Sequence, residues 1–291
     1  MSDSDPGDRR QASPDLLALR SALFVPLADD RFIARAHERG ADALLLDLED
    51  SVAPAQKEAA RARLPGAVRQ LRAAGATVMV RVNTAPEHEI LDLKAAAQAR
   101  VAAVFLPKVE KVDELHAAAY VLAPGKTKLV AMLESPAAVL DAEAIARAGP
   151  PLAGLVFGSE DYSSALGIAT TGAALDWPAQ MVATVARARG LAAFGLPGPI
   201  SGLDDIEEFT RLLERAKAMG FTGCACIHPK QVAAANRVYS PSDREIALAR
   251  EIVAAAEAAL REGRGAFALH GRMIDAPIVA QARTLLERVR R

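Results

Sequence analysis

Short apolar runs alternate with amphipathic segments along the chain, and this alternation restricts the folds that the sequence can adopt. Eight runs are rich in β-branched or other apolar residues and have the length of strands, so each predicts a β-strand. They cover residues 21–26, 43–50, 77–83, 103–108, 128–135, 154–161, 192–197 and 223–229. Runs that are apolar throughout are typical of a parallel sheet whose strands are buried on both faces.

The segments between the runs have the pattern of amphipathic helices. Apolar residues recur there at three- and four-residue steps, as at Ile206, Phe209 and Leu213. Glycine follows several segments, for example at Gly40 and Gly220, where a helix C-cap is expected. The predicted helices cover residues 29–39, 53–74, 112–122, 137–147, 179–189 and 204–219.

Eight strand–helix units in a row predict an α/β fold of the TIM (β/α)8 barrel type. An open, doubly wound sheet is the alternative, and its dinucleotide-binding version is disfavoured because no Gly-x-Gly-x-x-Gly motif follows a strand. Polar residues end nearly every predicted strand, and barrel enzymes build their active sites at that edge. These residues are Glu49, Asp50, Arg81, Asn83, Lys108, Glu134, Glu160, Asp161 and His228.

A long segment follows the last predicted strand. Helices predicted at 242–262 and 278–290 flank residues 263–276, which contain the motif Gly-Arg-Met-Ile-Asp. The first residues of the chain are polar and have no apolar stretch that would serve as a signal sequence. We therefore expect a disordered N-terminal tail (1–17), a barrel (18–240) and a C-terminal helical extension or lid (241–291).

The composition narrows the class of protein. The 291 residues are 51% hydrophobic and carry a formal net charge of −1, which provides a large core but no basic field for nucleic acid or an anionic membrane. No apolar run approaches the length of a membrane span. The two cysteines do not make a disulfide framework. We expect a cytoplasmic protein with a small-molecule substrate and with neither nucleic acid nor membrane as partner.

Glu134 and Asp161 end two consecutive predicted strands and are the first candidates for a metal site. Mg²⁺ prefers one or two protein carboxylates, completed by waters and substrate oxygens. For a single acid, the simpler interpretation is that it caps the following helix or pairs with a basic side chain. Two acids at adjacent strand ends instead favour a metal ion that they share. Glu160 is expected on the opposite side of the strand, in a structural role.

Arg81 ends the third predicted strand. Its guanidinium is suited to hold a substrate carboxylate through two hydrogen bonds or to stabilise an oxyanion. A buried ion pair with Asp47 or Glu49 is the alternative. The two roles are compatible, because a neighbouring acid can orient a functional arginine.

Cys224, Cys226 and His228 share one face of the last predicted strand. Alternate residues of a strand lie roughly 6–7 Å apart, too far for three ligands to reach one zinc ion at about 2.3 Å. We therefore expect the cysteines to fill the barrel interior. His228 is expected to bind substrate at the rim or only to anchor the turn at Pro229.

Lys57 and Arg61 lie four residues apart and so share one face of a predicted helix. Together with Arg20 they are candidates to bind an extended anion such as the phosphates of a nucleotide. A solvated helix face is the alternative for such charges.

At this point the sequence resembles a known family. Its motifs stand in order, and the match runs from about residue 18 to the C-terminus. The series of motifs is specific although each one alone is weak. They are RSALFVP (20–26), LDLEDSVAPAQK (46–57), VRVN (80–83), LPKV (106–109), ESP (134–136), GSED (158–161), IHPKQ (227–231) and GRMID (271–275). The chain resembles the citrate lyase β-subunit-like proteins of the HpcH/HpaI aldolase superfamily.

The resemblance implies a Mg²⁺-dependent (or Mn²⁺-dependent) carbon–carbon lyase. Its substrates would be 3-hydroxyacyl thioesters of coenzyme A or an acyl carrier, of the malyl-, citramalyl- or citryl type, cleaved to a 2-oxo acid and an acyl thioester. It also implies that the C-terminal extension packs on a neighbouring subunit, in a homotrimer or hexamer.

The resemblance further assigns roles by position. Glu134 and Asp161 correspond to the metal ligands, with Glu134 also facing the substrate, and Arg81 corresponds to the substrate-binding and oxyanion-stabilising arginine. The resemblance also assigns Glu49 and Asp50 as catalytic acids that bind the waters of the metal, and Asp275 as the acid/base of the C-terminal segment. For such a substrate we further expect Pro107 and His228 to contact the acyl portion, and Arg20, Lys57 and Arg61 to bind coenzyme A.

Two features depart from the family pattern, and both are expected near the substrate mouth. Members often carry lysine where this chain has Cys224, and segment 195–199 is uncharged where members are usually acidic and polar. Three other functions stay open: a thioesterase or malate-synthase-like activity on (3S)-malyl-CoA, a CoA-independent aldolase of 4-hydroxy-2-oxo acids, and an accessory subunit of a lyase complex.

Overall fold

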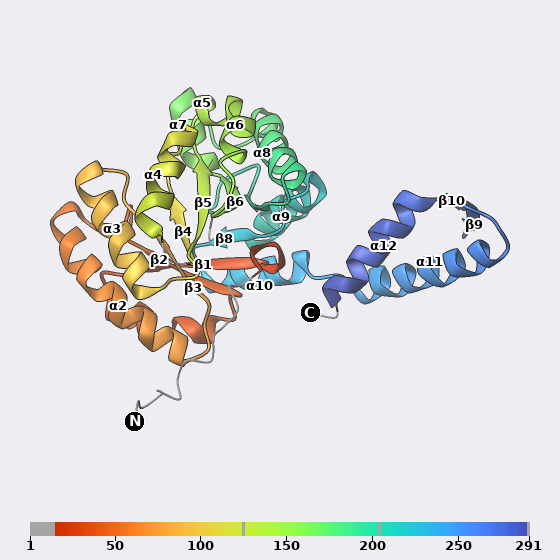
Figure 1. Ribbon diagram of the computed structural model, residues 1–291, viewed down its shortest axis with the longest axis horizontal. Coiled ribbons are helices and arrows are strands. Elements are labelled where there is room, and N and C mark those ends of the chain that lie inside the picture. Colours follow the sequence, from red (N-terminus) through yellow and green to blue (C-terminus); the bar gives the residue numbers. More distant parts are fainter. Residues whose placement is uncertain (1–14, 124–125, 203–204, 290–291) are drawn as a thin grey trace. The chain divides into compact units, whose positions relative to one another are not determined.

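The computed structural model describes residues 15–123, 126–202 and 205–289. The chain divides into two compact units, Met1–Tyr239 and Ser240–Arg291, which are described separately here (Figure 1). The expected disordered tail lies largely outside the described residues. Within it, η1 (Leu16–Ala18) is a 3₁₀ turn whose Leu16 is buried, so ordered structure precedes the expected barrel start at residue 18.

The first unit is a barrel of parallel strands in the order β7-β6-β5-β4-β3-β2-β1-β8. The strands are β1 (Ser21–Pro26), β2 (Ala43–Asp47), β3 (Val78–Arg81), β4 (Ala103–Leu106), β5 (Lys128–Leu133), β6 (Leu152–Phe157), β7 (Ala192–Gly195) and β8 (Cys224–Cys226). A parallel bridge between Phe194 and Gly223 connects β7 to the start of β8. Gly223 is required there, because a Cβ atom would lie 2.3 Å from the carbonyl oxygen of Leu19. The predicted TIM barrel is confirmed.

Helices surround the strands and cover their outer faces (Figure 1). They are α1 (Asp30–Ala34), α2 (Lys57–Ala73), α3 (Pro86–Ala99), α4 (Val112–Leu122), α5 (Pro136–Leu140), α6 (Ala142–Ala146), α7 (Ser159–Leu166), α8 (Asp176–Ala188), α9 (Ile206–Met219) and α10 (Pro229–Tyr239), with 3₁₀ turns η2 (Ala36–Arg39), η3 (Pro54–Gln56) and η4 (Ala173–Leu175). The helices predicted at 29–39 and 137–147 are each divided into two. The second division falls at Asp141, which ends α5 and begins α6.

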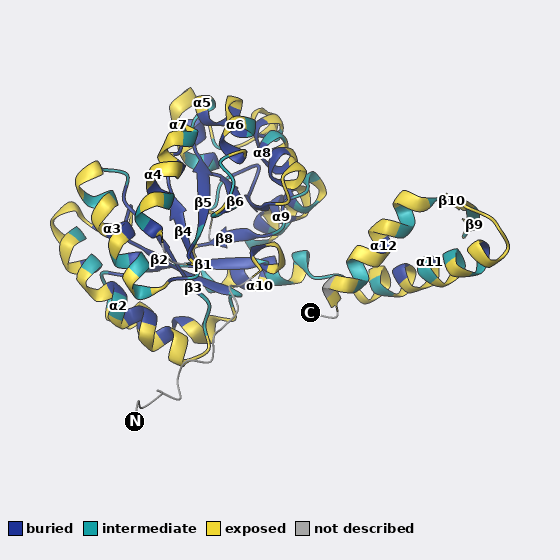
Figure 2. Cartoon of the chain, viewed as in Figure 1, coloured by how far each residue is buried: buried dark blue, intermediate teal, exposed yellow. Residues whose placement is uncertain are grey.

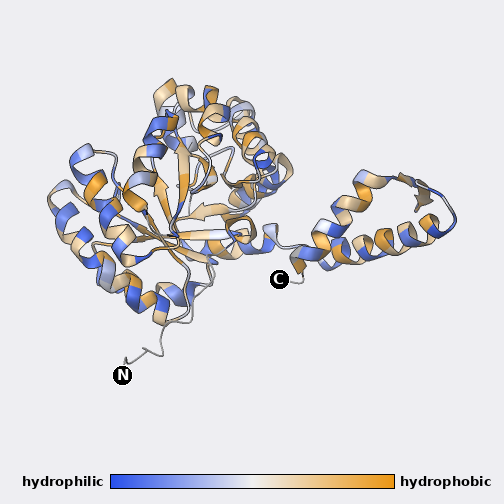
Figure 3. Ribbon diagram, viewed as in Figure 1, coloured by the Kyte–Doolittle hydropathy of each residue, from blue (hydrophilic) through white to orange (hydrophobic). Residues whose placement is uncertain are grey.

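Two apolar layers stabilise the barrel. Burial is concentrated in its strands (Figure 2), which are also largely hydrophobic (Figure 3). Phe105 and Phe194 pack inside the barrel with ring centroids 6.1 Å apart, and Leu16 belongs to the same interior cluster. The second layer lies between strands and helices. Cys224 and Cys226 belong to this outer layer, so the expectation that they fill the barrel interior near the substrate mouth is wrong. Because side chains alternate along β8, Ala225, which lies between the two cysteines, points into the barrel instead.

The strands end earlier than predicted, because polar side chains bind the backbone just after the strand ends. Asp47, the last residue of β2, accepts hydrogen bonds from the backbone N–H groups of Glu49 and Ser51 and so begins a turn. Asn83 donates its backbone N–H to Asp92 of α3 instead of to a neighbouring strand. Arg81 is the last residue of β3, whereas Glu49, Asp50, Lys108, Glu134 and Asp161 lie in loops or in a first helical turn rather than on strands.

The second unit is a helical pair with a β-hairpin between the helices. Its elements are α11 (Asp243–Arg261), β9 (Phe267–Leu269), β10 (Arg272–Ile274) and α12 (Ala276–Val289). Ser242 and Glu245 form a capping box at the start of α11. The hairpin was not predicted. Its two-residue turn uses His270 and Gly271, both with positive φ as a tight hairpin requires. The packing of this extension on a neighbouring subunit stays a prediction.

Candidate active site

The candidate active site lies at the carboxyl ends of β2 to β6, where a parallel barrel presents its last side chains. Glu134 directly follows β5 and is only 5% exposed. Its Oε2 accepts a hydrogen bond of 2.8 Å from the backbone N–H of Lys108, which follows β4. Burial raises the pKa of Glu134 to about 7, and the nearby carboxylates of Asp161 and Glu49 add to the shift.

Gly158 provides the space that the Glu134 side chain occupies. A Cβ atom at position 158 would lie 2.5 Å from Cγ of Glu134 and 2.8 Å from its Oε1. The backbone of Gly158 is held in turn, because its N–H donates to the carbonyl of Leu133 at 3.1 Å. Any larger residue at this position therefore displaces the Glu134 carboxylate.

Asp161 lies in the first turn of α7, which begins directly after Gly158. Its charge acts on both Glu134 and Lys108, so the structure places the two predicted metal ligands on the same part of the rim. Asp161 is exposed, in contrast to the buried Glu134. The Glu134 carboxylate is thus buried, whereas the Asp161 carboxylate is accessible to solvent.

Glu160 binds the loop between β7 and α9 instead of facing Glu134. Its Oε1 accepts hydrogen bonds from the backbone N–H groups of Ile200 at 3.1 Å and Ser201 at 3.2 Å. These bonds agree with the structural role expected for Glu160, but the reason given for it was wrong. β6 ends at Phe157, so Glu160 and Asp161 diverge because successive helical residues point about 100° apart.

Arg81 is surrounded by carboxylates. Its Nε and Nη2 donate to the two oxygens of Asp47 at 2.8 and 2.7 Å. Its Nη1 lies 2.9 Å from Glu49 and 3.0 Å from Asp50, and the guanidinium carbon lies 4.7 Å from the ring centre of Phe24. Although burial works against the charged form, the hydrogen bonds of Asp47 raise the pKa of Arg81. The buried ion pair considered as an alternative is therefore present.

Glu49 and Asp50 differ in their freedom to move. Glu49 is buried between Arg81 and Lys108, and burial raises its pKa despite the opposing charge of Arg81. The side chain of Asp50 is 63% exposed, and its contact within this cluster is the ion pair with Arg81. A substrate anion therefore replaces Asp50 on Arg81 at lower cost than it replaces Asp47 or Glu49.

Lys108 is the site residue to which the sequence assigned no role. It has a positive φ of 55°, and in this conformation its N–H reaches Glu134 while its Nζ donates to Glu49 at 3.1 Å. A left-handed conformation costs a residue other than glycine about 1–2 kcal/mol. The sequence did contain a feature that points to Lys108, because this residue ends a predicted strand as the other site candidates do.

The three predicted coenzyme A-binding residues do not come together. Arg20 precedes β1, at the amino-terminal end of the barrel, and pairs with Asp42 at 2.7 Å. Lys57 begins α2 and donates its Nζ to the carbonyl of Leu48 at 2.9 Å, and Arg61 pairs with the buried Asp92. The combination of Arg20 with the other two is thus wrong, and both Lys57 and Arg61 brace loops at the rim.

The predicted substrate-binding residues Pro107 and His228 lie at the rim, and the predicted acid/base Asp275 lies in the second unit. Pro107 is buried directly after β4. His228 follows β8, and its Nδ1 accepts the backbone N–H of Lys230 at 3.2 Å, so it anchors the turn at Pro229. Asp275 lies in the second unit between β10 and α12, where its carbonyl accepts the N–H of Val279.

The chemistry of Glu134 and Asp161 fits a magnesium ion. Both provide hard oxygen donors, and their like charges raise the cost of ionising Glu134 unless a cation is present. No cluster of three or more His, Cys, Asp or Glu side chains in the described ranges is arranged to hold a metal. Two carboxylates completed by waters and substrate oxygens suffice for Mg²⁺.

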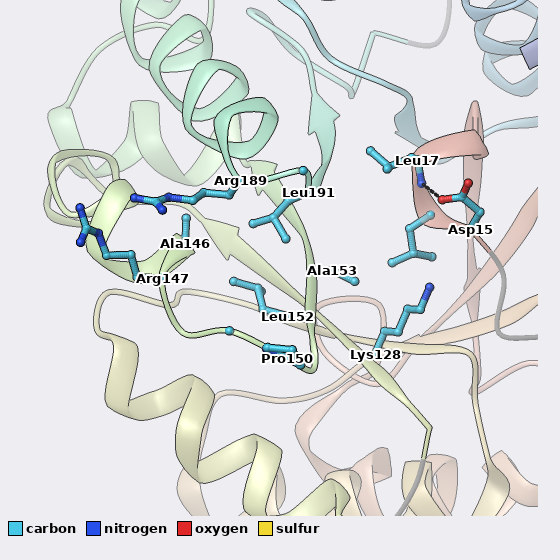
Figure 4. Close-up of a pocket in the computed structure, with 13 residues that line it drawn as sticks. Asp15, Leu17, Lys128, Ala146, Arg147, Pro150, Leu152, Ala153, Arg189 and Leu191 are labelled. Atoms are coloured by element: carbon cyan, nitrogen blue, oxygen red, sulfur yellow. Dashed lines mark hydrogen bonds between the residues drawn. The ribbon is translucent and has the colours of Figure 1, made fainter. Parts of the chain in front are cut away.

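A pocket of about 510 Å³ lies at the other end of the barrel, away from the candidate site (Figure 4). Lys128 and Leu152, the first residues of β5 and β6, line it together with Leu16 and Leu17 of η1. Arg147 and Arg189 lie at its edge, and both pair with Glu143. The pocket shares no residue with the rim.

Known proteins resemble the chain over most of its length. The family described as HpcH/HpaI aldolase/citrate lyase matches residues 20–229. A citrate lyase subunit beta-like protein of Deinococcus radiodurans is 37% identical over 277 residues, which are 92% of this chain and 96% of that protein. An L-malyl-CoA/beta-methylmalyl-CoA lyase of Cereibacter sphaeroides is 32% identical over 307 residues, with 96% of each chain covered.

A solved structure has the same architecture. The protein CitE from Mycobacterium tuberculosis, in complex with magnesium, acetoacetate and coenzyme A, superposes with a TM-score of 0.77. It is 31% identical in sequence, and the match covers 93% of this chain and 98% of that one. None of the helices described in the present structure has the length and hydropathy of a membrane span. The chain belongs to the HpcH/HpaI aldolase/citrate lyase family.

Proposed function

We propose that the protein is a Mg²⁺-dependent lyase that cleaves a carbon–carbon bond of a 3-hydroxyacyl-CoA thioester. The buried Glu134, held by the N–H of Lys108 in a space that only Gly158 leaves open, is the observation that carries this proposal. The similarity to a malyl-CoA lyase and to a CitE protein solved with magnesium and coenzyme A supports it.

Glu134 and Asp161 would hold the Mg²⁺ ion. When bound there, the ion would supply Lewis acidity to the hydroxyl and carboxylate oxygens of a substrate. Glu49 and Asp50 would accept hydrogen bonds from its waters. Their positions beside Arg81, with Asp50 exposed and Glu49 buried, support this assignment.

The reaction requires a 3-hydroxyacyl thioester with a carboxylate on the carbinol carbon. The hydroxyl would pass its proton to a carboxylate of the rim, the adjacent C–C bond breaks, and the bonding electrons pass to the thioester as an enolate. Arg81 would stabilise negative charge on the former hydroxyl oxygen as it becomes a carbonyl. Asp275 would donate a proton to the enolate carbon, which gives the acyl thioester beside a 2-oxo acid.

The remaining assignments rest on position alone. Pro107 and His228 would contact the substrate at the rim, and Lys57 and Arg61 would lie beside its coenzyme A portion. Asp275 would act on the barrel of a neighbouring subunit in a homotrimer or hexamer. The oligomer and the cytoplasmic location stay predictions.

The test is incubation with Mg²⁺ and malyl- and citramalyl-CoA, in which 2-oxo acid and free thiol are measured separately. A lyase releases the 2-oxo acid without free thiol. Free thiol without the oxo acid would identify a thioesterase instead. Absence of both products would contradict the proposal and leave the CoA-independent aldolase or the accessory subunit.

Matched variants connect the activity to the site. Glu134→Gln and Asp161→Asn should each lose Mg²⁺ binding and turnover. Glu160→Gln is the control, because it changes the adjacent acid, whose contacts are with the β7–α9 loop. Equal loss of Mg²⁺ affinity in Glu160→Gln and Asp161→Asn would contradict the assignment of Asp161.

A further inference from the structure

The pocket at the amino-terminal end of the barrel combines apolar surface with a basic edge (Figure 4). Its apolar surface comes from Leu16, Leu152 and Leu191, which are otherwise buried in the barrel. Its volume of about 510 Å³ lies within the range of about 300–1,000 Å³ that is typical of small-molecule sites. The pocket is therefore large enough for a ligand, and its lining shows which class of ligand it suits.

Cations outnumber acids around this pocket. The described residues that line it include three cations and one acid, namely Lys128, Arg147, Arg189 and Asp15. Glu143 lies behind the two arginines and accepts hydrogen bonds from Nε of Arg147 at 2.6 Å and from Nη2 of Arg189. Even when Glu143 is counted, three positive charges stand against two negative charges. The local charge therefore favours an anion.

Arg147 and Arg189 retain the capacity to bind a further anion. A guanidinium has five N–H donors, and each of these two donates one of them to Glu143. The remaining donors have no partner within the part of the chain that the structure describes. The side chains of Arg147, Arg189 and Glu143 are 66%, 38% and 43% exposed, and ion pairs as exposed as these stabilise a protein little. A ligand anion can therefore bind the arginines while Glu143 stays in place.

The charged and apolar groups occupy different parts of the pocket. Figure 4 shows the two arginines on one side and Lys128 with Asp15 on the other. Leu152 and Leu191 lie between them. A ligand whose anionic group binds the arginines therefore extends its remaining atoms over apolar surface.

A β-bulge forms part of the pocket wall. Leu129 of β5 stands opposite Leu152 of β6, and Val130 stands opposite Gly154, so Ala153 has no partner residue on β5. Ala153 is half-buried and lines the pocket. Bulges are over-represented beside functional sites, where they redirect a side chain. The small side chain at this position leaves space that a larger residue would fill.

The two arginines also have a structural role that needs no ligand. Arg147 is the C-cap residue of α6 and Arg189 that of α8. A cation at this position offsets the partial negative charge at the carboxyl end of a helix. This role accounts for the positive charge but not for the apolar cavity beside it.

We infer that this pocket binds a small amphiphilic anion. A carboxylate or phosphate group of the ligand contacts Arg147 and Arg189, and its apolar body covers Leu152 and Leu191. The site lies at the opposite end of the barrel from Glu134 and Asp161, and it does not depend on the proposed lyase function.

Equilibrium dialysis with octanoate tests this inference. The control compounds are 1-octanol, which has the same alkyl chain without the charge, and inorganic phosphate, which has the charge without the chain. We expect octanoate to bind saturably and at least about tenfold more tightly than either control, because it alone combines a charge-assisted hydrogen bond with burial of an alkyl chain. Absence of saturable binding, or equal affinity for octanoate and either control, would overturn the inference.

A double variant locates the bound octanoate. Arg147→Gln/Arg189→Gln removes both cations that would hold the carboxylate, and we expect it to weaken octanoate binding at least about tenfold. The matched control is Arg211→Gln/Arg215→Gln, which removes two ion-paired arginines of α9 that are 58% and 43% exposed. We expect this control to bind octanoate as the wild type does. Equal affinity in the two double variants would place octanoate elsewhere and overturn the inference.

A substitution at the bulge tests the apolar part of the site. Ala153→Phe fills the space that the alkyl chain would occupy, and Ala153→Ser is the control of similar size. We expect octanoate binding to be lost in Ala153→Phe and kept in Ala153→Ser, and wild-type affinity in a folded Ala153→Phe would overturn the inference. Circular dichroism verifies the fold of each variant. If Ala153→Phe unfolds, the arginine variants decide the question alone, because their substitutions are at exposed side chains.

Discussion

The backbone N–H of Lys108 donates to Oε2 of Glu134 at 2.8 Å, and it does so from a left-handed backbone conformation. The same residue places its Nζ on Glu49. One residue therefore orients the buried carboxylate with its backbone and adds a positive charge to the carboxylate cluster with its side chain. The two contributions can be separated, because a substitution removes the amine and keeps the backbone N–H.

Lys108→Met should bind Mg²⁺ more tightly than the wild type. The substitution removes a positive charge near Asp161 while the N–H of residue 108 continues to hold Glu134, and a charge at this distance changes affinity by about 3- to 10-fold. Isothermal titration with Mg²⁺ measures the change, and Lys108→Arg is the control that retains the charge. A large loss of affinity in Lys108→Met would show that the amine itself supports metal binding.

Gly158→Ala should abolish Mg²⁺ binding without unfolding the barrel. The added Cβ would lie 2.5 Å from Cγ of Glu134 and so displaces that carboxylate. A displacement of about 1 Å at a catalytic group costs on the order of 10² in rate. Gly66→Ala is the control, since nothing lies within 4 Å of a Cβ atom there. Wild-type Mg²⁺ affinity in Gly158→Ala would refute the steric argument.

Mg²⁺ affinity should fall as the pH drops below about 7. Burial raises the pKa of Glu134 to about 7, so below that value a proton competes with the metal for the carboxylate. The affinity should be independent of pH above 7 and should fall about tenfold per pH unit below it, as for competition with one proton. Calorimetry at several pH values in buffers of different ionisation enthalpy would also detect the released proton.

The same pKa predicts that the metal-free protein loses stability as the pH rises. A carboxyl group with a raised pKa in the folded state stabilises the fold fully below its ordinary pKa of 4.5, and this contribution is lost as the pH rises through about 7. Glu134→Gln, which stays neutral, should therefore stabilise the metal-free protein at pH 8 by up to about 3 kcal/mol. Urea unfolding in EDTA measures this difference, which should be absent at pH 4.5.

Arg81→Ala should lose both activity and stability. Loss of a group that stabilises developing charge costs about 10²–10³ in rate, and breaking a buried ion pair costs about 3–5 kcal/mol because Asp47 is left without its partner. The double variant Asp47→Asn/Arg81→Gln should recover much of the stability but none of the activity. Recovery of activity in the double variant would mean that Arg81 has only a structural role.

The sequence predicted the barrel because the periodicity of its strands and helices is local information. It also located Glu134, Asp161 and Arg81, since polar residues at the ends of apolar runs mark the rim. The structure was needed for contacts between distant segments. The role of Lys108 depends on a positive φ, and the separation of Arg20 from Lys57 depends on which end of the barrel each residue occupies.

The cysteines were misplaced for a similar reason. Alternation shows that Cys224 and Cys226 share a face, but not which of the two apolar layers that face meets. A strand buried on both sides has the same apolar pattern in either orientation. The pairing of β8 with β1 resolves the question, because Ala225 stands opposite the interior residue Ala22.

Two adjacent acids in the first turn of α7 connect the position of the β7–α9 loop to the position of a proposed metal ligand. Glu160 holds the β7–α9 loop, and Asp161, the next residue, faces the proposed metal site. A shift of this turn would therefore move the β7–α9 loop and the Asp161 carboxylate together. A lineage that changes the loop to accept a different acyl group is therefore constrained to keep Glu160 or replace its hydrogen bonds. Directed evolution of this enzyme should accordingly vary residues 196–201 and leave α7 unchanged.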